Sequence, residues 1–192
     1  MENLERVFEL RFEREIDERK QDSYILSYRD MLEYFKDIGQ LTSKDVVVGA
    51  HMVYGWMPTI VHLNKDGSDL GEILHILQSV KDDKADLSED QIITIKRYIN
   101  NSVVGASKLL HFISPDSYPI WDSKIFQFTH GHMPHQYQVN NPGTYLKYRE
   151  KILALEQHSK FPEFHASVNR KLKYEVSGLR ALELIMFLKR DH

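Results

Sequence analysis

Cysteine is absent from this 192-residue chain, and its absence excludes several kinds of site at once. A disulfide scaffold, a cysteine-ligated zinc ion, an iron–sulfur cluster and a thiol nucleophile all need that side chain. Long apolar runs are missing as well, since none reaches the roughly 18 residues expected of a membrane-spanning helix. The stretch from Met1 to Arg14 carries charges throughout, unlike a secretory signal. We therefore expect no membrane segment, with the cytoplasm as the default compartment.

The common nucleotide- and ester-binding motifs are also missing. The sequence has no Gly-rich loop ending in Gly-Lys-Ser/Thr, no two-glycine dinucleotide fingerprint, no His-Glu-x-x-His zinc pair and no Gly-x-Ser-x-Gly elbow. Nucleotide hydrolases, dehydrogenases and serine hydrolases are therefore disfavoured. Because the formal net charge is -3, binding to nucleic acid would need a local basic face rather than a positive field around the whole protein.

The chain does contain enough apolar material for one core. Hydrophobic residues make up 42% and charged residues 28%, which is typical of a globular protein and not of a disordered chain. The length fits a single domain. We expect one helical domain over residues 1–192, in which residues 1–21 could form a helical appendage.

Apolar residues recur at helical spacing along most of the chain, which predicts an all-α protein. Start signals agree with this, because Ser88 and Gln91 form a capping-box pattern and Thr42 precedes the apolar stretch 46–57. A strand is the alternative for that stretch, since it opens with three valines. We expect an orthogonal bundle of about eight or nine helices. Four ranges would supply its core: 46–57, 70–77, 103–112 and 179–188.

One stretch in the middle of the chain combines small, basic and acidic residues between predicted helices. It covers residues 104–112 and continues, beyond a proline, over residues 118–123. Gly105, with small neighbours between two helices, lets backbone amides face outward. Lys108 follows this glycine closely, and Asp122 follows a proline-bounded turn. A basic and an acidic side chain could therefore meet near one turn.

The order of these residues resembles that of the helix-hairpin-helix DNA glycosylase superfamily. The resemblance implies a similar fold in the middle of the chain, with Gly105 in a hairpin that binds a DNA backbone phosphate. It also implies that Lys108 is a nucleophile that attacks the anomeric carbon of the sugar. Asp122 would then stabilise charge or activate the nucleophile.

Such chemistry places a demand on the lysine. A lysine attacks only in its neutral form, so burial or a neighbouring cation must lower its pKa, and Arg97 and His111 are candidates for that neighbour. Ordinary structural roles are the alternative. They are close helix packing at Gly105, a solvent-directed Lys108 and a helix N-cap at Asp122.

Four further residues are candidates for ligand binding: Ser107, Tyr54, Trp56 and Trp121. Aromatic rings could stack on a base or line an apolar site. Core packing is the alternative for the aromatic cluster at residues 54–59. This cluster and residues 107–112 also resemble stretches of uncharacterised bacterial and phage-encoded proteins, a resemblance that implies no activity.

Three histidines lie close together in the sequence, namely His130, His132 and His135. They could hold zinc, copper or nickel if a carboxylate completed the set. Their spacing is irregular and includes a glycine and a proline, so we interpret the stretch as an exposed loop with incidental histidines. We therefore predict no metal ion and no other cofactor.

Two functions are compatible with these observations. A DNA-directed protein of glycosylase type would excise bases or bind DNA, and it would need Lys108 and Asp122 to face a shared cavity beside Gly105 and Trp121. A non-catalytic helical module would instead bind a protein partner or a second copy of itself through an exposed apolar patch. The charge-rich segment 4–16 is a candidate for that contact.

Overall fold

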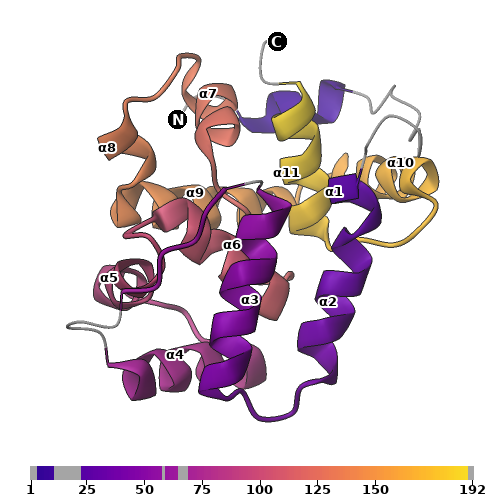
Figure 1. The fold of residues 1–192 in the computed structure, drawn as a ribbon. Coiled ribbons are helices and arrows are strands. Elements are labelled where there is room, and N and C mark those ends of the chain that lie inside the picture. Colours follow the sequence, from indigo (N-terminus) through magenta and orange to yellow (C-terminus); the bar gives the residue numbers. More distant parts are fainter. Residues whose placement is uncertain (1–3, 11–22, 58, 65–68, 190–192) are drawn as a thin grey trace.

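Figure 1 shows the computed structural model, which describes residues 4–10, 23–57, 59–64 and 69–189. Within these ranges the chain forms eleven α-helices and one 3-10 helix, together with an isolated bridge between Leu63 and Ile99. In chain order the elements are η1 (Leu4–Glu9), α1 (Ser23–Leu26), α2 (Tyr28–Asp37), α3 (Ser43–Trp56), α4 (Leu70–Asp83), α5 (Glu89–Tyr98), α6 (Val103–Ile113), α7 (Ser123–His130), α8 (Gln136–Val139), α9 (Pro142–Leu155), α10 (Phe161–Leu172) and α11 (Gly178–Leu188).

The predicted all-α bundle is confirmed, although it contains more helices than the eight or nine expected. The short helices α1 and α8, of four residues each, explain part of the difference, because periodicity cannot resolve a single turn. The predicted helix over residues 4–16 begins as the 3-10 helix η1, and residues 11–16 lie outside the described residues. Among the described helices, none is both long and apolar enough to cross a bilayer.

Side-chain caps start two of the helices at the predicted positions. The backbone amide of Ser88 donates to the side chain of Gln91 at 2.9 Å, and the amide of Gln91 donates to the Ser88 hydroxyl in return. Thr42 and Asp45 begin α3 in a similar way, with 2.9 Å from the Thr42 amide to the Asp45 carboxylate. The stretch 46–57 is therefore helical, and the alternative of a strand is wrong.

Helix α6 lies at the centre of the bundle, in contact with α2, α3, α4 and α5 (Figure 1). It is buried continuously from Gly105 to Ile113, and α11 is buried in the same way from Gly178 to Met186. Both were predicted as core. Because these helices are buried along most of their length, most of their polar groups need partners inside the protein.

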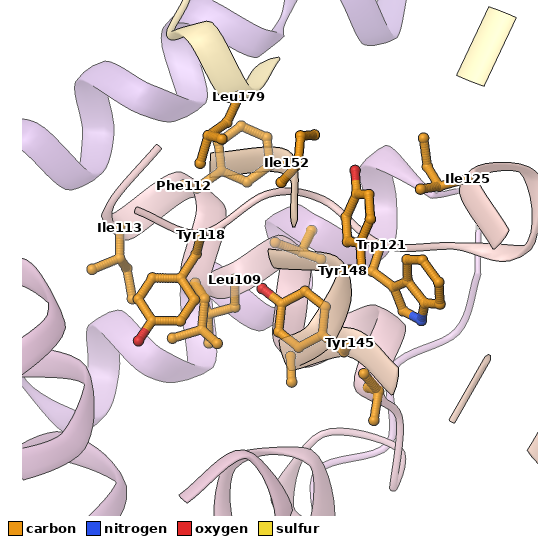
Figure 2. Packing of buried hydrophobic residues seen from close by; sticks show 14 of the residues in the cluster. Leu109, Phe112, Ile113, Tyr118, Trp121, Ile125, Tyr145, Tyr148, Ile152 and Leu179 are labelled. Atoms are coloured by element: carbon orange, nitrogen blue, oxygen red, sulfur yellow. The ribbon is translucent and has the colours of Figure 1, made fainter. Parts of the chain in front are cut away.

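The aromatic part of the core lies between α6, α7 and α9. Figure 2 shows Tyr118, Trp121, Tyr145 and Tyr148 together in this region, and all four are fully buried. The rings of Trp121 and Tyr148 are 4.9 Å apart, centroid to centroid. Trp121 thus belongs to the core, which favours packing over ligand stacking for this residue.

Candidate functional site

Between α6 and α7 the chain crosses the core over residues 117–122, here called the linking segment, without forming a helix or strand. Residues 117–121 are buried, so their backbone amides and carbonyls need partners within the protein. Side chains supply these partners in place of a neighbouring strand. They come from α6, α9 and α11: Ser107, His111, Tyr145, Arg149 and Glu183.

Two of these side chains stand one helical turn apart on α6. The Ser107 hydroxyl accepts from the amide of Trp121 at 3.1 Å, and His111 Nδ1 donates to the carbonyl of Tyr118 at 2.8 Å. Since Nδ1 carries the proton, His111 Nε2 accepts from the Tyr28 hydroxyl at 2.7 Å. Burial lowers the pKa of His111 to about 3 and keeps the ring neutral. Ser107, a predicted ligand-binding residue, therefore has its hydroxyl engaged in the core.

Helix α9 supplies two more partners for the linking segment. The Tyr145 hydroxyl donates to the carbonyl of Pro119 at 3.2 Å, and Arg149 Nε donates to the carbonyl of Ser117 at 2.6 Å. The guanidinium of Arg149 also pairs with the Asp86 carboxylate at 2.6 Å. These contacts fix the first half of the segment.

Helix α11 fixes the second half through a buried ion pair. Glu183 accepts a hydrogen bond from the amide of Ile120, and its other oxygen accepts from Arg180 Nη1 at 2.8 Å. Burial raises the pKa of Glu183 to about 7, against the opposing effect of the Arg180 guanidinium. Arg180 also lies over the rings of Tyr28 and Trp56. No local sequence pattern marks Glu183 as a partner of residue 120.

The linking segment ends at Asp122, which caps α7. Its Oδ1 accepts from the amides of Lys124 and Ile125, both at 2.9 Å. The N-cap expected as an alternative is therefore present. The aromatic residues over 121–128 predict a helix that Trp121 opens, and the structure begins this helix two residues later, after the Asp122 cap.

Lys108 differs from the other buried polar residues of α6. Its side chain is only 8% exposed, yet its ammonium group makes no hydrogen bond or ion pair within the part of the chain that the structure describes. The nearest defined contact of Nζ is the ring of Trp56, 5.5 Å from its centroid. The Lys108 side chain is thus largely buried, although Nζ is not one of the fully enclosed polar atoms that lack a partner within the described residues, so the structure does not contradict a solvent-directed amine. None of the hydrogen bonds that hold the linking segment uses Lys108.

Burial is the main reason why the pKa of Lys108 is lowered. The cations of Arg180 and Lys124 lower it further, while the carboxylates of Asp122 and Glu183 oppose this. The cations that act on Lys108 are therefore Arg180, which α11 supplies, and to a smaller extent Lys124, and not Arg97 or His111, the two neighbours expected from the sequence. His111 cannot serve as the cation because it is neutral.

Half-buried aromatic rings and cations surround this lysine. The indole of Trp56 donates to the carbonyl of Tyr24 at 2.8 Å, and Lys124 Nζ lies 3.9 Å from the centroid of the Phe187 ring. Trp56 and Phe187 are each partly exposed, so the rings reach from the core to the surface. Cations beside aromatic faces are typical of surfaces that stack bases and contact phosphates.

A cavity of about 530 Å³ lies close to Trp56 and Lys124, because their chain neighbours Met57 and Ser123 line it. It is formed by the end of α3, the turn between α5 and α6, the start of α7 and the stretch around α8. Its lining contains Tyr54, Met57, Thr59, Asn100, Asn101, Ser102, Val104, Asp122, Ser123, Pro134, Gln136, Val139 and Asn140. Asp122 and Tyr54 line the cavity, whereas Lys108, Gly105 and Trp121 do not, so this cavity is not the one shared by Lys108 and Asp122 that the predicted enzyme site requires.

The turn between α5 and α6 makes one wall of this cavity. Asn100 and Asn101 both adopt left-handed backbone conformations, with φ of 52° and 49°. Backbone partners fix two amide side chains here: Asn100 donates to the carbonyl of Ile60 at 3.0 Å, and Asn140 accepts from the amide of Val103 at 2.8 Å. The wall is therefore shaped before any ligand arrives.

Gly105 lies in the first turn of α6, beneath the Tyr54 ring. Its amide donates to the hydroxyl of Ser102 at 3.1 Å, so this amide is engaged within the turn. A Cβ atom at position 105 would come within 2.5 Å of the Tyr54 hydroxyl oxygen. The glycine thus permits close packing, as the structural alternative expected, and it does not present a free amide to a phosphate.

The three histidines of the predicted loop do not line this cavity. His130 stacks on Phe126 with 3.9 Å between ring centroids, and His135 stacks on Tyr137 at 5.7 Å. His132 is exposed. Among the described residues, no group of three metal-binding side chains is close enough to hold an ion.

Comparison of the chain with protein families, with curated proteins and with solved structures found no match.

Proposed function

We propose that this protein is a DNA-directed enzyme of glycosylase type in which Lys108 is the nucleophile. The observation that supports the proposal is a buried lysine whose ammonium group has no hydrogen-bonding partner among the described residues. Buried lysines are rare because an unpaired charge inside a protein is costly. Burial and Arg180 lower the pKa of this amine, which favours the neutral form that a nucleophile needs.

The proposed reaction is displacement of a base by the lysine. The lone pair of Lys108 Nζ forms a bond to C1′ of a deoxyribose, and the bond from C1′ to the base breaks with its electron pair. The base leaves after taking up a proton. Loss of a proton from Nζ and opening of the bond from C1′ to the ring oxygen, which is protonated, then give an imine between lysine and sugar. Asp122 would stabilise positive charge that develops on the sugar.

The cavity beside Asp122 supports the proposal because it has a size and lining suited to a base that has left the helical stack. No lysine, arginine or histidine lines it, and Asn101 and Gln136 place amide groups there. Val104 lines it and lies one turn before Lys108 on the same side of α6. A base in the cavity would therefore bring its sugar toward the lysine.

The cations near the lysine support the choice of DNA as substrate. Lys124 stands beside the partly exposed ring of Phe187, so a phosphate and a base have complementary groups at one place, whereas Arg180 is buried and paired with Glu183. The formal charge of -3 for the whole chain gives no global attraction. We therefore expect DNA binding that is local, weak and sensitive to salt.

A trapping experiment tests the proposal. Duplex and single-stranded DNA with several damaged bases or an abasic site is incubated with the protein and borohydride, which reduces an imine to a stable amine. We expect a covalent adduct with the natural chain and a loss on the order of 100-fold in Lys108→Ala. Lys171→Ala is the matched control, because it removes an exposed lysine of α10 and keeps the proposed nucleophile and its neighbours. If none of the substrates gives base release or a covalent adduct, the proposal is overturned.

A second candidate function is binding of a protein partner through an exposed apolar patch. Ile60 and Tyr137 are 76% and 71% exposed, and Met133 is also exposed. Each is next in sequence to a residue that lines the cavity, so apolar side chains surround its opening. If the chain forms a dimer in light scattering and Ile60→Ser with Tyr137→Ser abolishes it, this function is favoured instead.

A further inference from the structure

Glu183 is a buried carboxylate that connects the candidate site to α11. It is 1% exposed and lies one helical turn after Arg180. Its two oxygens have different partners, since one accepts from Arg180 Nη1 at 2.8 Å and the other from the amide of Ile120. A carboxylate in such a place is costly unless its hydrogen bonds are made, so its identity is under a strong structural constraint.

Glu183 contacts the linking segment directly, through the hydrogen bond that it accepts from the Ile120 amide. Ile120 stands two residues before Asp122, and the backbone between them is already fixed at Trp121 by the Ser107 hydroxyl. The Trp121 indole donates to the carbonyl of Val139 at 2.9 Å, which anchors the same place from α8. A shift at residue 120 would therefore move the Asp122 carboxylate relative to α6.

Charged and titratable groups face Glu183 from every element that packs around it. Electrostatic effects connect it with Arg180 on its own helix, Lys108 on α6, Asp122 before α7, Tyr145 and Tyr148 on α9 and Tyr28 on α2. Arg180 Nε and the Tyr148 hydroxyl have no hydrogen-bonding partner within the described residues. The pair of Glu183 and Arg180 is therefore the central charged element between Lys108 and the aromatic core.

We infer that Glu183 is a positioning residue for the Lys108 site, because its hydrogen bond to the Ile120 amide orients Asp122. The inference rests on the proposed function for its consequence in catalysis. The hydrogen bond and the charge of Glu183 are separable, because glutamine can still accept from the Ile120 amide but carries no charge. Alanine removes both the acceptor and the charge.

The sign of the effect on Lys108 follows from the neighbouring charges. The Glu183 carboxylate favours the protonated lysine, whereas Arg180 and Lys124 disfavour it. In Glu183→Gln the two cations act with less opposition, so the pKa of Lys108 should fall. The pH at which adduct formation reaches half its maximum should then move down.

The experiment compares pH profiles of borohydride trapping, together with an NMR titration of lysine labelled at Cε, in the full chain. We expect Glu183→Gln to keep the maximal adduct yield within about threefold and to lower both the trapping midpoint and the Lys108 titration midpoint. Glu183→Ala should lose at least tenfold in adduct at every pH, because Asp122 is no longer held. Glu175→Gln, an exposed carboxylate before α11, is the matched control and should behave like the natural chain.

A purely structural role for Glu183 would lower thermal stability in both variants and leave the Lys108 midpoint unchanged, which would overturn the inference. If the natural chain forms no adduct at all, the proposed function fails. The Lys108 titration then decides the inference alone, and equal midpoints in Glu183→Gln and the natural chain reject it.

Discussion

At the residue scale, alanine substitutions at Gly105 and Gly55 test how closely these two helical positions are packed. A Cβ at position 105 would lie 2.5 Å from the hydroxyl oxygen and 2.9 Å from a ring carbon of Tyr54, whose ring is rigid and buried. Gly105→Ala should therefore lower the free energy of unfolding by about 1–3 kcal/mol. Gly55 is also helical and has nothing within 4 Å of its Cβ position.

Gly55→Ala should accordingly raise the free energy of unfolding by about 0.5–1 kcal/mol, because alanine loses less backbone entropy in a helix. Urea unfolding of both variants, followed by circular dichroism, provides the comparison. Equal effects of the two alanines would contradict the close contact between Gly105 and Tyr54.

The buried polar residues of α6 divide by what they contact. Ser107 and His111 satisfy the backbone of the linking segment, whereas Lys108 satisfies none of it. Structure therefore explains the first two without any ligand. It leaves the lysine as the polar residue of α6 whose burial calls for a chemical role.

At the scale of elements, Asp122 has two roles that substitution can separate. Asn and Asp are comparable N-caps, so Asp122→Asn should keep the cap of α7 and change the free energy of unfolding by less than about 0.5 kcal/mol. Asp122→Ala removes the acceptor for two amides and should cost about 1 kcal/mol. Chemical denaturation measures both values.

Adduct formation should not follow stability in the same two variants. If the charge of Asp122 stabilises the reacting sugar, adduct formation should fall on the order of 100-fold in Asp122→Asn as well as in Asp122→Ala. An Asp122→Asn protein with full trapping activity would show that the carboxylate serves only as a cap.

The linking segment explains why α6, α9 and α11 carry polar residues on buried faces. Its backbone crosses the core with no strand beside it, so side chains have to supply the hydrogen bonds that a sheet would provide. The segment ends at Asp122, which lies at the start of α7. The position of this carboxylate is therefore set by residues on three other helices.

At the scale of the whole molecule, His111 makes stability depend on pH. Its pKa is about 3 in the folded chain and 6.5 as the ordinary value, so below pH 6.5 the unfolded chain binds a proton that the folded chain does not. The free energy of unfolding should therefore fall as the pH falls from about 6.5 toward 3, by up to about 1.4 kcal/mol per pH unit.

Glu183 acts with the opposite sign, because its pKa is raised to about 7 and the folded chain binds the extra proton between 4.5 and 7. The informative quantity is thus the difference between the natural chain and His111→Asn, in which the Glu183 effect cancels. Urea unfolding at a series of pH values should show this difference shrinking as the pH falls below 6.5. A difference that is constant with pH would mean that folding does not change the pKa of His111.

Much of the fold was predictable from the sequence because helices are specified locally. The apolar spacing and the caps at Thr42, Ser88 and Asp122 act within a few residues, and the helices begin where these caps stand. Single turns such as α1 and α8 were missed, since four residues carry no detectable period. Trp121 was assigned to a helix because its aromatic neighbours continue the apolar pattern on both sides of the cap.

The candidate site was predictable only in part. The sequence by itself determined the all-α architecture, the core helices and the pairing of Lys108 with Asp122 as residues of interest, because those depend on local spacing and residue type. Tertiary structure alone decided that Lys108 is buried without a hydrogen bond, that Arg180 is its cationic neighbour and that Glu183 holds Ile120. Residues 120 and 183 lie 63 positions apart, and no local pattern encodes which helices pack together; that choice depends on how all the apolar faces are buried at once.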